Sequence, residues 1–151
     1  MNLRKIIIIT ISAVCTFILF CIAILFFLYH FVTATWNYQE KTYYSDKDNF
    51  ITEEAIVDSI SYSEEYGNIW FVLSEIDEAY EDNQFVVRGE NAIVLLEREL
   101  FNKVNTGSKI TYTSAPKYLG DGYSMPIVAI TVDGEELLGF DEGYENLMET
   151  Y

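Results

Sequence analysis

The sequence has few of the side chains that most often carry catalysis or bind transition metals. It contains one histidine, His30, and two cysteines, Cys15 and Cys21, and all three lie within an apolar stretch near its beginning. The rest of the chain therefore lacks an imidazole and a thiol, which excludes Ser-His-Asp and Cys-His catalysis there. It also lacks the usual ligands of zinc, copper and haem. The phosphate-binding patterns GxxxxGK[ST] and GxGxxG are absent as well, and we expect neither catalytic residues nor a cofactor.

Two further absences bear on the cellular compartment in which the protein resides. No cysteine follows residue 21, so the later part of the chain has no disulfide framework and must be stabilised by packing. No Asn-x-Ser/Thr acceptor occurs, so the sequence gives no sign of a glycosylated ectodomain. Together with frequent Ile, Asn, Glu and Tyr, these absences favour a surface protein of a Gram-positive bacterium.

What the chain does have is a long apolar run. Residues 6–32 contain no acidic, Lys, Arg, Gly or Pro residue. As an α-helix this run is about 40 Å long, whereas the hydrocarbon core of a bilayer is about 30 Å thick. A cleaved signal peptide is the alternative, with 32–34 (Val-Thr-Ala) as a weak cleavage site, but its apolar core is usually only about 7 to 15 residues long. We predict an uncleaved transmembrane helix over 6–32.

The flanks of this helix predict its orientation. Arg4 and Lys5 precede it without any acid, whereas Lys41 and Lys47 lie farther from its other end. Basic residues in short flanks stay in the cytoplasm. We therefore expect residues 1–5 to be a cytoplasmic N-terminus and the chain after the helix to lie outside the plasma membrane.

The outer part of the chain is strongly acidic. All 24 acids but only 7 of the 9 basic residues follow residue 36, so this part carries 7 − 24 = −17. Such a charge repels phosphate backbones, and nucleic acid is excluded as a partner. The same part is rich in Tyr, Phe, Ile and Val in periodic runs, so it is able to bury a core and is not a disordered acidic tail.

Strand patterns dominate this outer part. Residues 33–49 are polar and aromatic without an apolar period, which indicates a juxtamembrane spacer, and the acidic extracytoplasmic domain is expected over 50–151. Alternation before and after the turn at 63–67 predicts a hairpin. A helix over 52–59, capped by Thr52, is the competing interpretation. Asp133-Gly134 predicts a second, two-residue hairpin turn.

One amphipathic helix is predicted after the third strand, over 91–104. Asn91 is its expected N-cap, Glu99 and Lys103 an i,i+4 ion pair, and Gly107 its stop. Its expected apolar face consists of Ile93, Leu96, Leu100, Phe101 and Val104. Three strands, a helix and further strands match the order of an OB-like barrel with one helix between strands 3 and 4, and this β-rich α+β domain is our prediction. A generic α+β sandwich is the alternative.

Acidic loops raise the question of calcium. Oxygen-rich loops bind Ca²⁺ through carboxylates and carbonyls, but the EF-hand spacing is absent, and a run of acids is usually a solvated loop. The candidate ligands are Glu75, Asp77, Glu78, Glu81, Asp82 and Asp121, with Asn83 beside them. With 24 acids in the chain, some carboxylates always lie near one another, so proximity alone is no evidence for glycoside cleavage. That reaction requires two carboxylates with different pKa values, and nothing in the sequence marks such a pair.

Aromatic side chains beside predicted turns form a candidate ligand or partner surface: Tyr66, Trp70, Tyr112, Tyr118 and Tyr123. Stacked rings hold sugars or peptides, and the loops of OB-type barrels bind oligosaccharides. The structural alternative is that these rings cover core edges with their hydroxyls in water.

These observations favour a non-catalytic, single-pass membrane protein whose outer domain is a binding or accessory module of the bacterial cell envelope. Its loops over 77–83 and 114–123 are expected to meet an envelope protein or glycan. Two alternatives stay open: an immunity- or stress-type factor that acts through its membrane helix, and a weak Ca²⁺-binding module.

Overall fold

The computed structural model describes residues 3–77, 84–116 and 124–151 of the chain. The chain divides into two compact units, Met1–Gln39 and Glu40–Tyr151, and we call the second unit the barrel domain. The barrel domain thus begins ten residues before the boundary at residue 50 that the sequence suggested.

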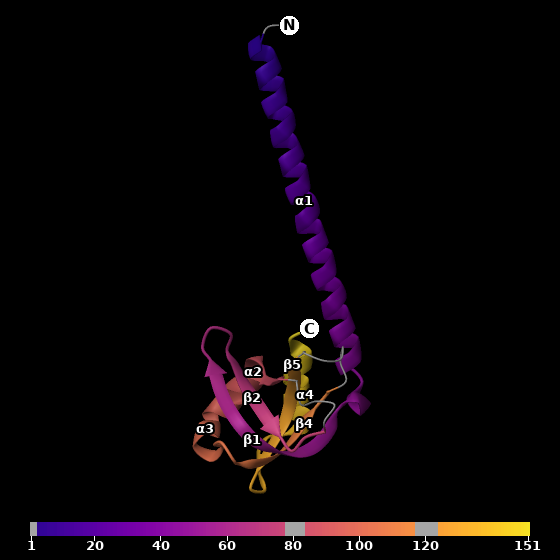
Figure 1. The fold of residues 1–151 in the computed structure, drawn as a ribbon. Coiled ribbons are helices and arrows are strands. Elements are labelled where there is room, and N and C mark those ends of the chain that lie inside the picture. The colour runs from indigo at the N-terminus through magenta and orange to yellow at the C-terminus, as the bar shows by residue number, and fades with distance from the viewer. Residues whose placement is uncertain (1–2, 78–83, 117–123) are drawn as a thin grey trace. The chain divides into compact units, whose positions relative to one another are not determined.

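Helix α1, Leu3–Tyr44, contains the predicted membrane span (Figure 1). From Thr10 onward it is long and apolar enough to cross a membrane. Within it, the hydroxyl of Thr16 donates a hydrogen bond to the carbonyl of Ser12, which satisfies a polar group inside the apolar helix. The predicted spacer, 33–49, is not an extended linker: it is helical to Tyr44 and ends in the 3-10 turn Lys47–Asn49.

The described part of the barrel domain contains six strands and three further helices. They are β1 (Ile51–Ser63), β2 (Asn68–Ser74), β3 (Gln84–Val87), α2 (Gly89–Glu97), α3 (Leu100–Lys103), β4 (Lys109–Ser114), β5 (Ser124–Val132), β6 (Glu135–Leu138) and α4 (Phe140–Glu149). Residues 52–59 lie in β1, so the strand prediction is confirmed and the competing helix is wrong.

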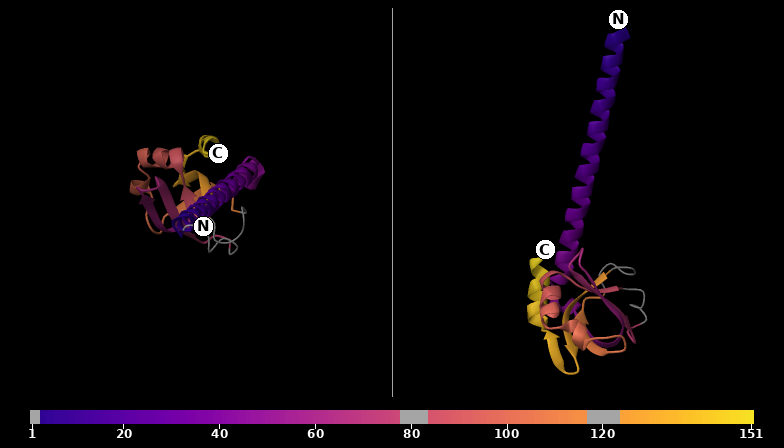
Figure 2. Two further views of the ribbon diagram at one scale, coloured as in Figure 1. Left: turned by 90° about the horizontal axis from the view of Figure 1, so that it is seen from above. Right: turned by 90° about the vertical axis from the view of Figure 1, so that its left-hand side faces the viewer.

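Five of these strands close a small barrel. β1 pairs antiparallel with β2 and β4, β2 pairs with β3, and β4 pairs with β5. A parallel pairing between β3 and β5 closes the ring, and β6 extends β5 as a hairpin partner. Helix α2 lies between β3 and β4 in the chain, as predicted, and the barrel is OB-like rather than an open α+β sandwich. Figure 2 shows α2 and α4 side by side on one flank of the barrel.

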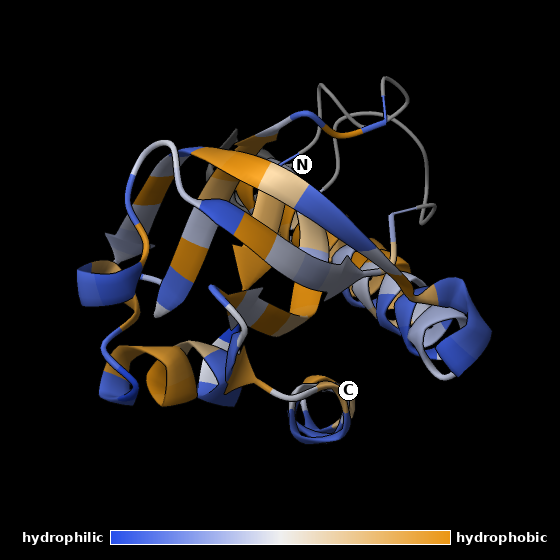
Figure 3. Cartoon of the chain, turned by 90° about the horizontal axis from the view of Figure 1, so that it is seen from below, coloured by the Kyte–Doolittle hydropathy of each residue, from blue (hydrophilic) through white to orange (hydrophobic). Residues whose placement is uncertain are grey.

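The core follows from alternation along the strands, which Figure 3 shows as alternating hydrophobic and hydrophilic colours. In β2, Ile69, Phe71 and Leu73 are buried inside the barrel, whereas the side chains between them face outward. Phe85 of β3 and Tyr112 of β4 meet edge to face inside it, with ring centroids 5.1 Å apart.

The helical segment after β3 differs from its prediction. Instead of one helix over 91–104, α2 and α3 are separated at Glu99, whose φ of 60° is left-handed. Asn91 is not a cap, because α2 begins at Gly89 and Asn91 is buried. Two members of the expected apolar face, Ile93 and Phe101, are 48% and 37% exposed. Lys103 pairs with Glu135 at 2.8 Å rather than with Glu99.

The last helix, α4, packs on the outer face of β5 around a second, smaller core. Tyr44, Ala115, Val128 and Leu147 are its buried members. Gly143 makes this packing possible, since a Cβ at that position would overlap the carbonyl of Val128. The helix is ten residues long, from Phe140 to Glu149.

Candidate binding surface

The hairpin of β1 and β2 carries the most exposed aromatic residues of the barrel domain's described part. Tyr66 in the turn is 68% exposed, and Tyr62 of β1 is 41% exposed. On the outer face of β2, Val72 is 49% exposed and Trp70 is half-buried. Tyr66 and Trp70 therefore occupy the surface that the sequence proposed for them.

Serines accompany Trp70 and Val72 on the outer face of the hairpin. Cross-strand pairing places Ser61 opposite Trp70 and Ser59 opposite Val72, and both serines are exposed. Tyr62 pairs with Ile69, so its side chain lies on the other face of the two strands. No charged residue occurs in β1 after Asp58 or anywhere in β2. We call residues 59–63 together with Tyr66, Trp70 and Val72 the hairpin surface. On a chain that carries 24 acids, this uncharged surface is a local exception.

Sequence reasoning missed part of this surface. Tyr62 and Val72 were not among the candidates. The serines at 59, 61 and 63 alternate with Ile60 and Tyr62, which indicates one polar face of β1 but does not signal that Tyr62 is exposed on the other. Tyr112, by contrast, is not a surface residue: it is 2% exposed, and its hydroxyl donates to Oε2 of Glu53 at 3.2 Å. The ring of Tyr112 belongs to the core, as the structural alternative proposed, but its hydroxyl is bonded to a side chain of the protein instead of lying in water. Tyr118 and Tyr123 lie outside the described residues.

The calcium candidates fall mostly where the structure gives no description. Glu78, Glu81, Asp82, Asn83 and Asp121 lie outside the described residues. Glu75 and Asp77 are exposed beyond the end of β2. Within residues 3–77, 84–116 and 124–151, no three His, Cys, Asp or Glu side chains gather as a metal site would require. A calcium site stays a prediction.

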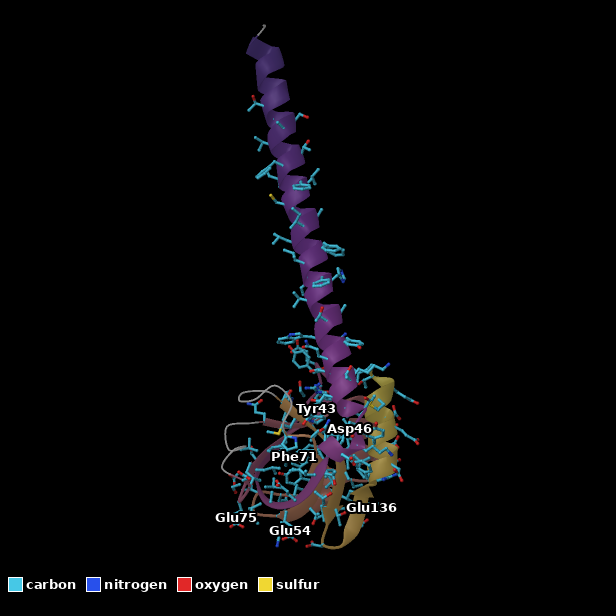
Figure 4. All side chains as sticks on the ribbon, turned by 90° about the vertical axis from the view of Figure 1, so that its right-hand side faces the viewer. Tyr43, Asp46, Glu54, Phe71, Glu75 and Glu136 are labelled. Atoms are coloured by element: carbon cyan, nitrogen blue, oxygen red, sulfur yellow. The ribbon has the colours of Figure 1, made fainter. Side chains whose placement is uncertain are left out.

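A shallow hollow of about 250 Å³ lies on the outer face of β1, β4 and β5, beside the Asp133-Gly134 turn. On its wall, Nζ of Lys109 is 2.6 Å from Oε2 of Glu54. The hydrogen bond and the charge of Glu54, with a smaller effect of Glu75, raise the pKa of Lys109 above 10.5. Figure 4 shows Glu54 and Glu75 at the same end of the barrel. A raised pKa does not suit a general base, because base catalysis near neutral pH requires a lowered lysine pKa.

Ser114 is the one described residue whose buried side-chain oxygen has no hydrogen-bond partner among the described residues. It ends β4, next to Thr113, whose hydroxyl pairs with that of Thr52 at 2.8 Å. A nucleophilic serine requires an adjacent base, which is most often a histidine. The single histidine of the chain, His30, belongs to the other compact unit, so the barrel domain offers no histidine to activate Ser114.

Comparison with known proteins adds no relative from which a role can be transferred. No family model, no curated protein and no solved structure matches this chain. The function must therefore be argued from the geometry of the barrel domain, and the hairpin surface is the feature of that geometry best suited to binding.

Proposed function

We propose that the chain is a single-pass, membrane-anchored binding module of a bacterial envelope and not an enzyme. In this proposal α1 anchors the protein, Arg4 and Lys5 keep its beginning in the cytoplasm, and the acidic barrel domain is presented outside the plasma membrane. The domain supplies a surface for recognition rather than chemistry.

One observation carries this proposal. The hairpin surface exposes Tyr62, Tyr66, Trp70 and Val72 to solvent on strands that carry no charge over residues 59–63 and 68–74, and acids occur only at its ends, at Asp58, Glu64 and Glu65. Tyr and Trp are enriched at protein interfaces, because they bury a large area at a low cost in side-chain entropy. A partner that covers this surface would remove apolar area from water.

Orientation is tested by cysteine labelling. Both native cysteines lie in α1, so a single Ser61→Cys substitution creates the only thiol of the barrel domain. We expect a membrane-impermeant maleimide to label Ser61→Cys in intact cells and to label Asn2→Cys only after lysis. The reverse pattern would overturn the proposed orientation.

Binding is tested by site-specific photo-crosslinking in the full chain, in its own membrane. A photoreactive phenylalanine analogue replaces Tyr66 on the hairpin surface or, as the control, exposed Glu97 on α2. We expect discrete adducts from Tyr66 and none from Glu97. Equal adducts at both positions, or none at Tyr66, would contradict the proposal.

The same experiment separates the proposal from a factor that acts through its membrane helix. Residues 6–32 are replaced with an unrelated apolar helix of equal length, and crosslinking at Tyr66 is repeated. Adducts that persist support recognition by the barrel domain. Adducts that disappear favour recognition by the membrane helix and overturn the proposal.

A further inference from the structure

Within the described part of the chain, one edge of β1 has no strand beside it over residues 59–63. On that edge β1 pairs with β4 only as far as Ile56, and Val57 then exchanges backbone hydrogen bonds with Ser108 and Gly107. Residues 59–63 pair with β2 on their other side. Among the described residues, no backbone group bonds to these five residues from the β4 side, and we call this segment the free edge.

Proteins shield exposed edges with lysine, proline, inward-pointing charges, β-bulges or a covering segment. The free edge contains no lysine, proline or charge, and its one irregularity is the register shift between Val57 and Ser59, where the edge begins. Residues 59–63 read Ser-Ile-Ser-Tyr-Ser, and Ser59, Ser61 and Tyr62 are exposed. An uncharged edge of this kind presents unpaired N–H and C=O groups that an added strand can satisfy.

Charges at the two ends of the free edge decide what kind of strand fits. Asp58 precedes it, and Glu64 and Glu65 follow it in the turn, all three exposed. In an antiparallel pairing of two copies centred on Ser61, Asp58 of one copy would face Glu64 of the other. Like charges directly opposite each other destabilise a strand pair, so a second copy is disfavoured.

We propose that the partner of this module is a protein, recognised through an extended basic segment that adds as a strand to the free edge. This inference rests on the proposed function and names its class of partner. The segment carries an uncharged stretch of about five residues between basic side chains about 20 Å apart, which meet Asp58 at one end and Glu64 at the other. The overall charge of the outer part favours the approach of such a segment.

The test uses the full chain in nanodiscs of phosphatidylcholine, which carries no net charge, and three labelled peptides. The first is Lys-Val-Thr-Val-Thr-Val-Lys with blocked ends. The second has the same sequence with N-methyl groups on its five central residues, which retains the charge but prevents strand pairing. The third has glutamate in place of both lysines. Affinity is measured by fluorescence anisotropy, and the location of binding by hydrogen exchange.

We expect the first peptide to bind about tenfold or more tightly than each control, because several backbone hydrogen bonds depend on the free N–H groups. We also expect it to slow exchange at the amides of residues 59–63. Equal affinity of the first two peptides would mean attraction to net charge alone and would overturn the proposal. Protection at another segment would overturn it too.

A matched pair of protein variants adds a second readout. Ser61→Lys and Ser45→Lys make the same change at two exposed serines, but only Ser61 lies on the free edge. We expect Ser61→Lys to weaken binding of the first peptide and Ser45→Lys to leave it nearly unchanged. Equal weakening would contradict strand addition. If the wild type sediments as a dimer that Ser61→Lys dissociates, the occupant is a second copy and the proposal is wrong.

Failure of this inference is distinguishable from failure of the proposed function. Envelope adducts at Tyr66, combined with no effect of peptide N-methylation, would retain the binding module and reject the basic strand. Loss of the adducts and of peptide binding together would reject both.

Discussion

The phenolic hydroxyl of Tyr151 donates a hydrogen bond of 2.9 Å to Oε2 of Glu40, 111 residues earlier in the chain. Beside it, Nζ of Lys41 lies 3.4 Å from the carbonyl oxygen of Tyr151, and the hydroxyl of Tyr144 donates to the carbonyl of Ser45 at 3.0 Å. The first and last residues of the barrel domain are thus bonded to each other. Residues that the sequence suggested as a spacer are an integral part of this domain.

The first prediction concerns where the folded domain begins. A fragment of residues 40–151 should unfold at a higher urea concentration than a fragment of residues 50–151, because the shorter one lacks Tyr44 and its contacts with Leu147 and Val128. Removing a buried aromatic side chain typically costs about 3 to 5 kcal/mol. Urea titration followed by circular dichroism measures the difference.

A point variant controls for the change in length. Tyr44→Ala in the longer fragment should lose most of the same stability, whereas Tyr43→Ala, at a half-buried neighbour, should lose less. Equal midpoints for the two fragments would show that the second core adds nothing to folding.

Much of the barrel was predictable because its signals are local. Alternation before and after the turn at 63–67 predicted the hairpin that β1 and β2 form. Asp133 and Gly134 have φ values of 50° and 80°, as a two-residue hairpin turn demands. The order of strands and helix was then sufficient to predict an OB-like arrangement, although it could not show the parallel pairing of β3 with β5 that closes the ring.

The rest depended on tertiary contacts that no local pattern records. Neither glycine nor proline interrupts residues 91–104, so nothing local signalled the left-handed turn at Glu99. In the sequence, Tyr44 belongs to a polar and aromatic segment close to the membrane span. In the fold it is buried in the second core together with Leu147 of α4, and no local pattern predicts that contact. Of the aromatic residues that the sequence proposed for the candidate surface, Tyr66 is exposed, Trp70 is half-buried and Tyr112 is buried. A ring beside a turn has the same sequence pattern whether it faces inward or outward, so its role in binding stays a prediction.

Gly143 provides the second prediction. Gly143→Ala should destabilise the barrel domain by about 1 to 3 kcal/mol, because the new methyl group has no room against the backbone carbonyl of Val128. The control is Gly139→Ala, whose methyl group would meet only the mobile carboxylate end of Glu136. Thermal unfolding of both variants measures the contrast. Similar melting temperatures would mean that α4 lies farther from β5 than described.

A buried amide network between α2 and α4 gives the third prediction. Nδ2 of Asn91 donates to the carbonyl of Gly143 at 2.8 Å, and its Oδ1 accepts from Nδ2 of Asn146 at 2.9 Å. Asn91→Ala leaves both partners without their bonds, so we expect a loss of about 1 to 3 kcal/mol. Asn102→Ala, at an exposed position on α3, should change stability by less than about 0.5 kcal/mol. A negligible effect of Asn91→Ala in urea titration would argue against the network.

The fourth prediction concerns Lys109, whose pKa is raised above 10.5, mainly by its hydrogen bond and ion pair with Glu54 and to a smaller extent by Glu75. Because the folded-state pKa lies above the unfolded value, any stability from this pair is fully present below pH 10.5 and is lost as the pH rises through the folded pKa. Glu54→Gln should return the pKa of Lys109 toward its ordinary value, and Glu75→Gln should lower it less. NMR titration of the side-chain resonances next to Nζ measures both shifts. Concentrated salt should reduce the wild-type shift, since the pair is exposed to solvent and its attraction is screened. An unchanged pKa in Glu54→Gln would show that the ion pair does not persist in solution.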